Sequence, residues 1–244
     1  MFDEVVDPHI RIIKKSNIEE FLGKIKAFKD LSKESIRLLD KRIQKLKFKK
    51  GEILFTEFDE ARGVFFVDHG IVKLTKLDEN GNEIIVCIKK EGEIFAEACL
   101  FNEQMSNYPA TATMVQAGEI FFLNTEKLEQ ELLHSPELGV RIIHYMSEAL
   151  RDMTLSLRDV TMLDVQTKTI KTLEKLARKF GERVHNEVHV ELPVTVQEFA
   201  SLVGSSRESV SRVFSKLKKE GIIVASGKKI IIPDWNHFCS LTTK

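Results

Sequence analysis

One segment, residues 195–221, constrains the fold more than any other part of this sequence. The pattern of a capping box occurs in it twice, as Thr195 with Glu198 and as Ser205 with Glu208. In such a box a hydroxyl and a carboxylate satisfy the free N–H groups of a first helical turn. A glycine between the two patterns allows the backbone reversal that ends the first helix. Two short helices joined by a tight glycine turn predict a helix-turn-helix.

The outward face of the second helix favours nucleic-acid recognition. Polar and charged side chains cover it, with Arg207, Glu208 and Arg212 in or next to its first turn and a half. A recognition helix presents these positions to base edges in the major groove. Arginine can bond guanine O6 and N7 together, and glutamate can accept from cytosine N4. We therefore predict these three residues as base contacts; the alternative is a solvated polar face stabilised by i,i+4 ion pairs.

A second group of side chains is predicted to contact the DNA backbone. After the helix-turn-helix, Ile222–Val224 and Ile230–Ile232 flank a basic tip and indicate a hairpin. Such a wing is placed to touch phosphates beside the recognition helix, and nearby hydroxyl and ammonium groups can do the same. The candidates for these sequence-independent contacts are Thr195, Ser205, Ser206, Ser209, Ser211, Lys216, Lys228 and Lys229.

The net charge of zero conceals an asymmetry. Residues 165–244 hold 14 lysines and arginines against 8 acidic residues, whereas residues 1–164 hold 23 against 29. A basic module behind an acidic body suits a nucleic-acid-binding domain attached to a different domain. No apolar run reaches membrane-spanning length, the first residues lack a signal-peptide pattern, and the three cysteines lack metal-site or disulfide spacing. We therefore expect a cytoplasmic protein with no membrane partner.

Short β-runs separated by glycines fill residues 48–124. They are rich in Val, Ile, Phe and Thr, and the pair Asn80–Gly81 marks a hairpin turn. Many short strands at near-even intervals predict an antiparallel jelly roll, which can hold one small ligand or be filled by its own side chains. Before it, we expect a loose arm over residues 1–16 and amphipathic helices at Asn17–Lys29 and Ser32–Lys47. The fold class is therefore α+β.

A long helix is predicted from Pro136, with Ser135 as its N-cap, to Leu163. It is apolar over an arc too wide for one partner. We assign one side to the jelly roll and the other to a two-stranded coiled-coil dimer seam; the alternative is burial in one larger core. The predicted seam residues are Ile142, Met146, Ala149, Met153, Leu157 and Val160.

Asp164 is a candidate N-cap for a further helix, Val165–Phe180, and the change of register there indicates a domain boundary and hinge. The predicted organisation is therefore an N-terminal double-stranded β-helix (jelly roll) domain at residues 1–134, a dimerisation helix at residues 135–163, and a C-terminal winged helix-turn-helix at residues 164–244.

This order of elements resembles the CRP/FNR family of bacterial transcription regulators over about residues 31–233. The stretches that carry the resemblance are DENGNEIIVCIKKEGEIFAEACLF in the sheet, MLDVQTKTIKTLEKLA at the hinge and GSSRESVSRVFSKLKKEGII in the DNA reader. Arg207, Glu208 and Arg212 match the reader of the catabolite-activator branch residue by residue. The resemblance implies a homodimer on a palindromic, TGTGA-like operator and allosteric control by a small effector. It also implies contact with RNA polymerase, for which Gly181–Glu187 is the candidate loop by its position in the family.

The effector pocket departs from the family's cyclic-AMP pattern. The family places Gly-Glu before a short helix and Arg-Ser after it, so that the Arg neutralises the cyclic phosphate and the Glu holds the ribose. Here Glu97 remains, but no Arg or Lys lies between Lys90 and Lys127. Burying a phosphate without a cation would be costly, so we expect an unidentified effector other than cyclic AMP. The candidate pocket residues are Val86, Glu97, Tyr108, Pro109, Met153 and Thr154.

Other functions are open alternatives. A regulator of the same fold could act without any effector. An iron–sulfur sensor needs N-terminal cysteines, whereas the first cysteine is Cys87, and a haem or redox role for Cys87 or Cys99 ranks below burial as small apolar residues. A cupin-type metal enzyme needs converging histidines, but only His69 lies in the β region, in an expected turn. We predict no catalytic residue, metal site or cofactor.

Overall fold

The computed structural model describes residues 11–12, 21–23, 25, 28, 32–40, 43–79, 81, 83–101 and 107–242. Most of the expected N-terminal arm and of the helix expected at Asn17–Lys29 lies outside these residues. The chain forms two compact units, residues 1–151 and 152–244. The division lies within helix α4 (Pro136–Met162), upstream of the boundary that the sequence predicts at Asp164. Each unit is described by itself.

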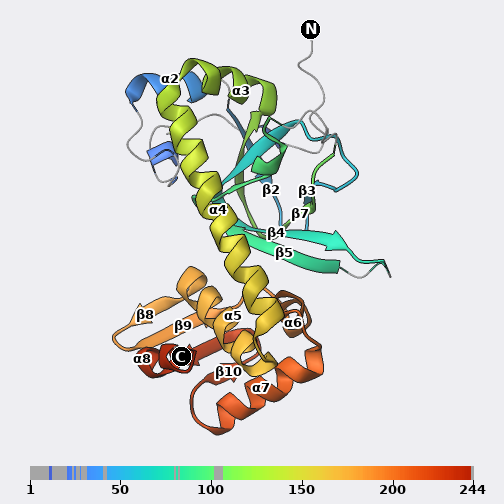
Figure 1. Ribbon diagram of the computed structural model, residues 1–244, viewed down its shortest axis with the longest axis vertical. Helices are drawn as coiled ribbons and strands as arrows, with labels where there is room; N and C mark the ends of the chain where they lie inside the picture. Colours follow the sequence, from blue (N-terminus) through green and yellow to red (C-terminus); the bar gives the residue numbers. More distant parts are fainter. Residues whose placement is uncertain are drawn as a thin grey trace. The chain divides into compact units, whose positions relative to one another are not determined.

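The first unit is built on an antiparallel sheet (Figure 1). Its strands lie in the order β1-β2-β7-β4-β5, while β3 pairs with β7 and β6 pairs with β4. This topology confirms the predicted β-rich N-terminal domain. The strand bounds are β1 Arg11–Ile12, β2 Gln44–Phe48, β3 Ile53–Phe55, β4 Gly63–Leu77, β5 Glu83–Lys90, β6 Ile94–Phe95 and β7 Thr111–Asn124.

Strand β4 bends in its middle rather than ending there. The register of its pairing with β7 shifts three times between Val67 and Val72, so the turn expected around His69 is a bulged part of a 15-residue strand. Gly70 has a φ of +100° at this point, and a side chain on Gly118 would clash with the carbonyl group of His69. Bulges and glycines let a long strand curve, so that its two ends can pair in different parts of one sheet.

The helices of the first unit are α2 (Lys33–Asp40), α3 (Thr125–His134) and the N-terminal part of α4, besides a short 3-10 turn, η1 (Glu97–Cys99). The prediction of one helix over Ser32–Lys47 is wrong, because residues 44–48 form β2. The five residues of β2 pair with β7, and Leu46 and Phe48 are buried in the core beside the sheet. Their spacing of two residues places both side chains on the same face of a strand.

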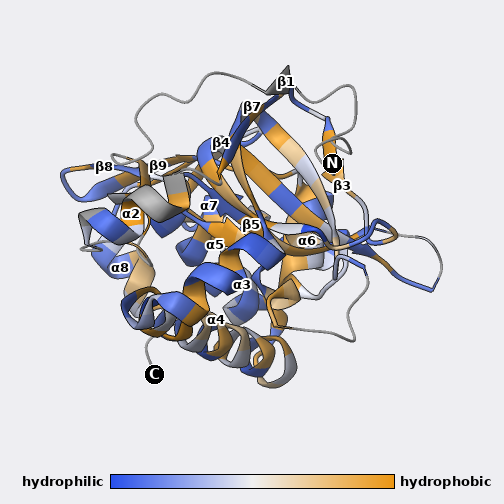
Figure 2. Cartoon of the chain, turned by 90° about the horizontal axis from the view of Figure 1, so that it is seen from above, coloured by the Kyte–Doolittle hydropathy of each residue, from blue (hydrophilic) through white to orange (hydrophobic). Residues whose placement is uncertain are grey.

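Helix α4 begins where the sequence predicts. The Leu138 N–H donates to the Ser135 hydroxyl, at 3.3 Å, and the helix continues for 27 residues to Met162. Leu138 and Ile142 are buried in a core that includes residues of α2, α3 and the sheet. Beyond them, hydrophobic and hydrophilic residues are interleaved along α4 (Figure 2), and most of its large apolar side chains are exposed.

The second unit is a winged helix-turn-helix, as predicted. Its helices are α5 (Val165–Phe180), α6 (Val196–Val203), α7 (Arg207–Lys219) and α8 (Trp235–Ser240). Its four-stranded sheet has the order β10-β11-β9-β8, with bounds β8 Glu182–Val184, β9 Glu187–Glu191, β10 Val224–Ser226 and β11 Lys229–Ile232. The segment expected as a loop at Gly181–Glu187 is instead the β8–β9 hairpin, and α8 was not predicted.

The cap predicted at the start of α5 is confirmed. The Asp164 carboxylate accepts from the Thr167 N–H, at 3.0 Å, and the Gly181 N–H donates to the Ala177 carbonyl, at 2.8 Å. Among the helices that the structure describes, none combines the length and apolarity needed to cross a membrane.

Candidate nucleic-acid interface

The start of α7 is set by the end of α6. The capping box predicted at Thr195 is confirmed, since its hydroxyl accepts from the Glu198 N–H and the Glu198 carboxylate accepts from the Thr195 N–H. The second box is wrong: Ser206, not Ser205, caps α7 and accepts from the Ser209 N–H at 3.2 Å. A backbone hydrogen bond to α6 already uses the Ser205 N–H, so no free donor remains there for a capping carboxylate.

This shift leaves the three predicted base contacts at the exposed N-terminal end of α7. Arg207 and Glu208 occupy its first turn, and Arg212 follows Glu208 by four residues. All three side chains are exposed. Within the described part of the chain, no hydrogen bond or ion pair engages them, so their polar groups are available to a ligand. The α7 N-terminus also carries the positive end of the helix dipole, which favours contact with a phosphate.

The opposite face of α7 fixes the helix in its unit. Val210, Val213 and Leu217 are buried, and the ring of Phe214 lies 5.1 Å from that of Phe199 on α6. These residues follow helical spacing, so burying them directs Arg207, Glu208 and Arg212 outward. The inward and outward faces are therefore both set by the same periodicity.

Some of the side chains predicted to contact the DNA backbone already form hydrogen bonds within the protein. Thr195 and Ser206 use their hydroxyls as helix caps, and Ser209 bonds the Ser206 hydroxyl at 2.9 Å. The Lys216 ammonium donates to Gln166 on α5, at 2.8 Å, so a phosphate contact would compete with that bond. Ser205 and Ser211 are partly exposed, and Lys228 and Lys229 are exposed at the wing's tip.

The predicted dimer seam needs one correction. Ile142 is only 5% exposed, because it packs into the core of its own unit, and it cannot also face a second chain. Six of the exposed apolar side chains of α4 instead follow a heptad spacing of three and four residues, while Val140, Leu155 and Met162 are exposed outside it. The six are Ile143, Met146, Leu150, Met153, Leu157 and Val160, so that Ile143 and Leu150 take the places expected for Ile142 and the partly buried Ala149.

In the first unit, Tyr108 belongs to the packed interior. It is 6% exposed, and its ring is stacked on that of Phe55 with centroids 3.8 Å apart. Its hydroxyl accepts from the backbone N–H groups of Arg62 and Gly63, at 3.1 and 3.2 Å. Burial raises the pKa of Tyr108 to about 12. Its side chain therefore supports the roll from within, with its hydroxyl oxygen already used as an acceptor.

Glu97 has a cationic partner that the sequence did not reveal. The ammonium of Lys89, on β5, lies 3.7 Å from the Glu97 carboxylate and donates to the carbonyl of Ile94 at 2.7 Å. The Tyr145 hydroxyl of α4 donates to the same carbonyl, at 3.0 Å. Burial is the largest single effect on Lys89 and opposes its charge, but Glu97 together with Tyr145, Cys87 and Glu93 outweighs it, so the pKa of Lys89 is raised. Glu97 is therefore already paired with a cation within its own unit.

Comparisons with known proteins agree with this architecture. Residues 45–135 match the cyclic nucleotide-binding domain family, and residues 168–241 match the Crp-like helix-turn-helix domain family. The chain is 28% identical to the anaerobic regulatory protein of Bacillus subtilis, covering 83% of this chain and 85% of that protein. It is 25% identical to the CRP-like cAMP-activated global transcriptional regulator of Mycobacterium tuberculosis, covering 89% of this chain and 96% of that one.

The chain belongs to the CRP/FNR family. Its fold is also that of FixK2 from Bradyrhizobium japonicum, with a TM-score of 0.70 at 19% identity, covering 82% of this chain and 96% of that one. As a CRP/FNR transcription regulator, it joins a domain of the cyclic nucleotide-binding type to a DNA-binding helix-turn-helix.

The remaining pocket candidates of this CRP/FNR chain lie on separate elements. Val86 is a bulge residue of β5 with its side chain exposed, and Pro109 is partly buried beside Tyr108. Met153 and Thr154 are exposed on α4, in the second compact unit. Among the six candidates, Glu97 forms an ion pair with Lys89, and the Tyr108 hydroxyl accepts from two backbone N–H groups.

The cysteines that the structure describes are free thiols. Cys99 is buried, and burial together with the nearby Glu97 carboxylate raises the pKa of its thiol to about 11, which keeps it protonated at neutral pH. Within the described residues, no group of three or more His, Cys, Asp and Glu side chains is placed to hold a metal ion.

Proposed function

We propose that this CRP/FNR regulator reads a palindromic, TGTGA-like operator through Arg207, Glu208 and Arg212. The supporting observation is that these three side chains share one exposed face at the N-terminal end of α7 and have no partner in the described part of the chain. Such side chains can make a bidentate contact of arginine to guanine and accept from cytosine N4 through glutamate. The hydroxyls at both helix starts and the wing lysines Lys228 and Lys229 would supply the sequence-independent contacts.

A homodimer is the second part of the proposal. The heptad stripe on α4 from Ile143 to Val160 supports it, because exposed apolar residues at this spacing suit a two-stranded coiled coil. Two copies of α7 would then read half-sites about 34 Å apart along one duplex. RNA polymerase is the further partner we propose, through the β8–β9 hairpin, whose β8 residues are all exposed.

Selection of bound duplexes from a random pool tests the reader. The unaltered protein is expected to enrich an inverted repeat, and Arg212→Ala is expected to lose selection at guanine positions, at a cost of about 1–3 kcal/mol. Lys228→Ala is the matched control: it should weaken all duplexes alike and lower the salt slope by about one unit. An unchanged consensus for Arg212→Ala would refute the assigned contact.

We also propose that the effector, if one acts, is not a cyclic nucleotide. Lys89 is the cation beside Glu97, but it is already paired with that carboxylate. A cyclic phosphate would have to break this ion pair or be buried without a cation. The stacked, hydrogen-bonded Tyr108 supports the second candidate, a regulator that needs no effector, because the aromatic cluster around it fills part of the roll.

Thermal unfolding separates these two candidates. A ligand that binds the native state must raise the melting temperature, by an amount that grows with its concentration. We expect cyclic AMP to leave the melting temperature unchanged. A rise with a fractionated metabolite extract would identify an effector, and no rise with any fraction would favour the effector-independent regulator. A concentration-dependent rise with cyclic AMP itself would overturn this part of the proposal.

A further inference from the structure

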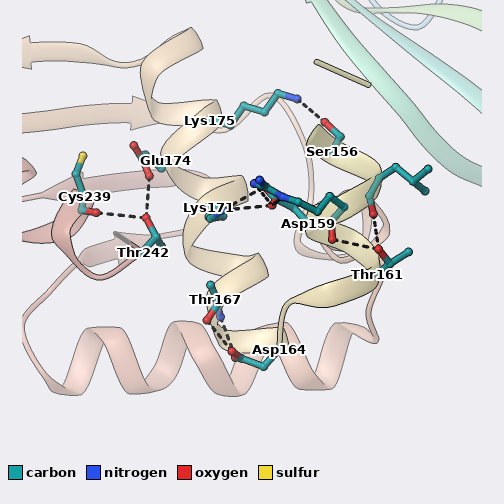
Figure 3. Close-up of polar contacts among 12 residues, drawn as sticks. Ser156, Asp159, Thr161, Asp164, Thr167, Lys171, Glu174, Lys175, Cys239 and Thr242 are labelled. Atoms are coloured by element: carbon teal, nitrogen blue, oxygen red, sulfur yellow. Dashed lines mark hydrogen bonds and ion pairs between the residues drawn. The ribbon is translucent and has the colours of Figure 1, made fainter. Parts of the chain in front are cut away.

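The last turns of α4 are held against α5 by polar contacts that come from both helices (Figure 3). The Lys171 ammonium lies 3.3 Å from one oxygen of the Asp159 carboxylate and 3.4 Å from the other. One turn further along α5, the Lys175 ammonium donates to the Ser156 hydroxyl at 3.2 Å. We call Ser156, Asp159, Lys171 and Lys175 the α4–α5 latch. All four residues lie in the second compact unit.

Two further contacts reinforce the latch at the turn between the helices. The Lys168 ammonium donates to the carbonyl oxygen of Val160, at 3.0 Å. The Asp164 carboxylate accepts both the backbone N–H and the hydroxyl of Thr167, in the first turn of α5. The end of α4 is therefore attached to α5 at several successive points, and α5 in turn packs on α6 and α7.

The electrostatics of Asp159 agree with a formed ion pair. Partial burial opposes its ionisation, but hydrogen bonds from Arg158 and Lys171 outweigh that effect, so the pKa of Asp159 is lowered. Arg158 is the neighbouring residue on α4 and adds no link to α5. Lys171 is thus the partner that ties this carboxylate to α5. We call α5, α6 and α7 together the reading unit.

The same two turns of α4 carry the end of the proposed dimer seam. Leu157 and Val160 are exposed members of the heptad stripe, and each directly follows a latch residue in the sequence. Successive residues are about 100° apart around a helix, so the latch face and the seam face lie side by side on α4. A second chain that packs on the seam would therefore meet a piece of α4 that is already part of the DNA-reading unit.

We propose that the α4–α5 latch positions the reading unit on the dimer seam and so sets the distance at which two copies of α7 meet adjacent half-sites. This inference rests on the proposed dimeric DNA reader. Asp159 and Lys171 act as positioning residues, because neither belongs to the face that reads bases. The preference for one half-site separation should therefore depend on Asp159, whereas the preference for particular bases within each half-site should not.

A panel of operators in which the half-site separation changes by single base pairs tests the proposal. The unaltered protein is expected to prefer one separation over its neighbours by about fivefold or more. Asp159→Asn keeps the size of the side chain but removes its charge, and it should lower that ratio to about twofold. The ratio compares duplexes with the same half-sites and the same total length, so a change in general DNA affinity cancels.

The chain offers a matched control and a rescue. Asp152→Asn removes a carboxylate one heptad earlier on α4, and should keep the preference of the unaltered protein. The double exchange Asp159→Lys with Lys171→Asp should restore it by reversing the ion pair. Affinity for a duplex with a single half-site should stay within about twofold in every variant, whereas a loss of folding would lower it throughout.

Two outcomes separate the failures. If the unaltered protein prefers one separation and Asp159→Asn keeps that preference, the latch is not a positioning device and the proposal is overturned alone. If the unaltered protein binds all separations, and a single half-site, equally well, the dimeric reader itself is refuted. A reduced preference in Asp159→Asn with rescue by the double exchange supports the proposal.

Discussion

Gly204 in the turn between α6 and α7 lies directly against Val160 of α4. A Cβ atom on Gly204 would be 3.0 Å from Cγ1 of Val160, closer than ordinary van der Waals contact. The glycine also has a φ of +65°, which the backbone reversal ahead of the recognition helix requires. Two separate demands therefore exclude a side chain at this position: the turn's conformation and the contact with α4.

The variant Gly204→Ala should lose more stability than an alanine variant of a glycine that has the same backbone conformation but no neighbouring side chain. Gly227, at the wing's tip, has a φ of +60° and nothing within 4 Å of its Cβ position. Both alanine variants should lose about 1–2 kcal/mol to the left-handed conformation, and Gly204→Ala about 1 kcal/mol more from crowding. Denaturant unfolding followed by fluorescence of Trp235, the single tryptophan, measures this, and equal losses would contradict the contact.

Tyr108→Phe should destabilise the first unit although it keeps the aromatic ring. The backbone N–H groups of Arg62 and Gly63 would lose their shared acceptor, and leaving the buried Gly63 donor unsatisfied costs about 1–3 kcal/mol. Tyr145→Phe is the matched control: it removes only one of two donors to the Ile94 carbonyl and should cost about 0.5–1.5 kcal/mol.

Unfolding followed by far-ultraviolet circular dichroism compares these two tyrosine variants. A larger loss in Tyr145→Phe than in Tyr108→Phe would show that the Tyr108 hydroxyl does not support the roll. A selective gain of ligand binding in Tyr108→Phe would also contradict the structural role assigned to that hydroxyl.

A charge in the α4 stripe should separate the proposed dimer. Leu150 and Met153 are each 66% exposed, at successive heptad positions. Leu150→Glu or Met153→Glu would place two like charges in the seam, where a partner chain offers them no cation. Leu133→Glu, on α3 outside the stripe, is the control for a charge at an exposed leucine. Sedimentation should find monomers for the first two variants only; dimers in all three would place the seam elsewhere.

Local signals in the sequence were enough to predict much of this fold. The caps at Thr195, Ser135 and Asp164 were predicted because each depends on a side chain and a backbone group three residues away. The helix-turn-helix and the β-rich domain follow from periodicity in the same way. The segment at residues 44–48 was assigned wrongly, because Leu46 and Phe48 suit an amphipathic helix and a half-buried strand alike.

Interactions between distant residues could not be predicted in this way. The pairing of Lys89 with Glu97 requires β5 and the turn after β6 to meet, and the pairing of Lys45 with Asp68 and Glu119 joins three strands. Ile142 was placed in the seam because its spacing fits either side of α4. Only the packing of α2 and α3 decides that it is buried. The start of α7 was missed by one residue because a bond from α6 decides it.

Stability should depend on pH through the cap of α5. Hydrogen bonds from the Thr167 hydroxyl and from its backbone N–H lower the pKa of Asp164. The folded pKa thus lies below the unfolded value of about 3.9, so this carboxylate contributes its full stabilisation above that pH and loses it as the pH falls through the folded pKa.

Asp164→Asn keeps an acceptor for the Thr167 N–H but cannot ionise. The free energy of unfolding, followed by Trp235 fluorescence, should therefore differ between the two proteins by a constant amount above about pH 5 and by less as the pH drops below about 4. Asp164→Ala, which removes the cap altogether, should cost about 0.5–2 kcal/mol at neutral pH. A difference between the native protein and Asp164→Asn that stays the same down to pH values well below 4 would mean that the charge of Asp164 does not stabilise this helix start.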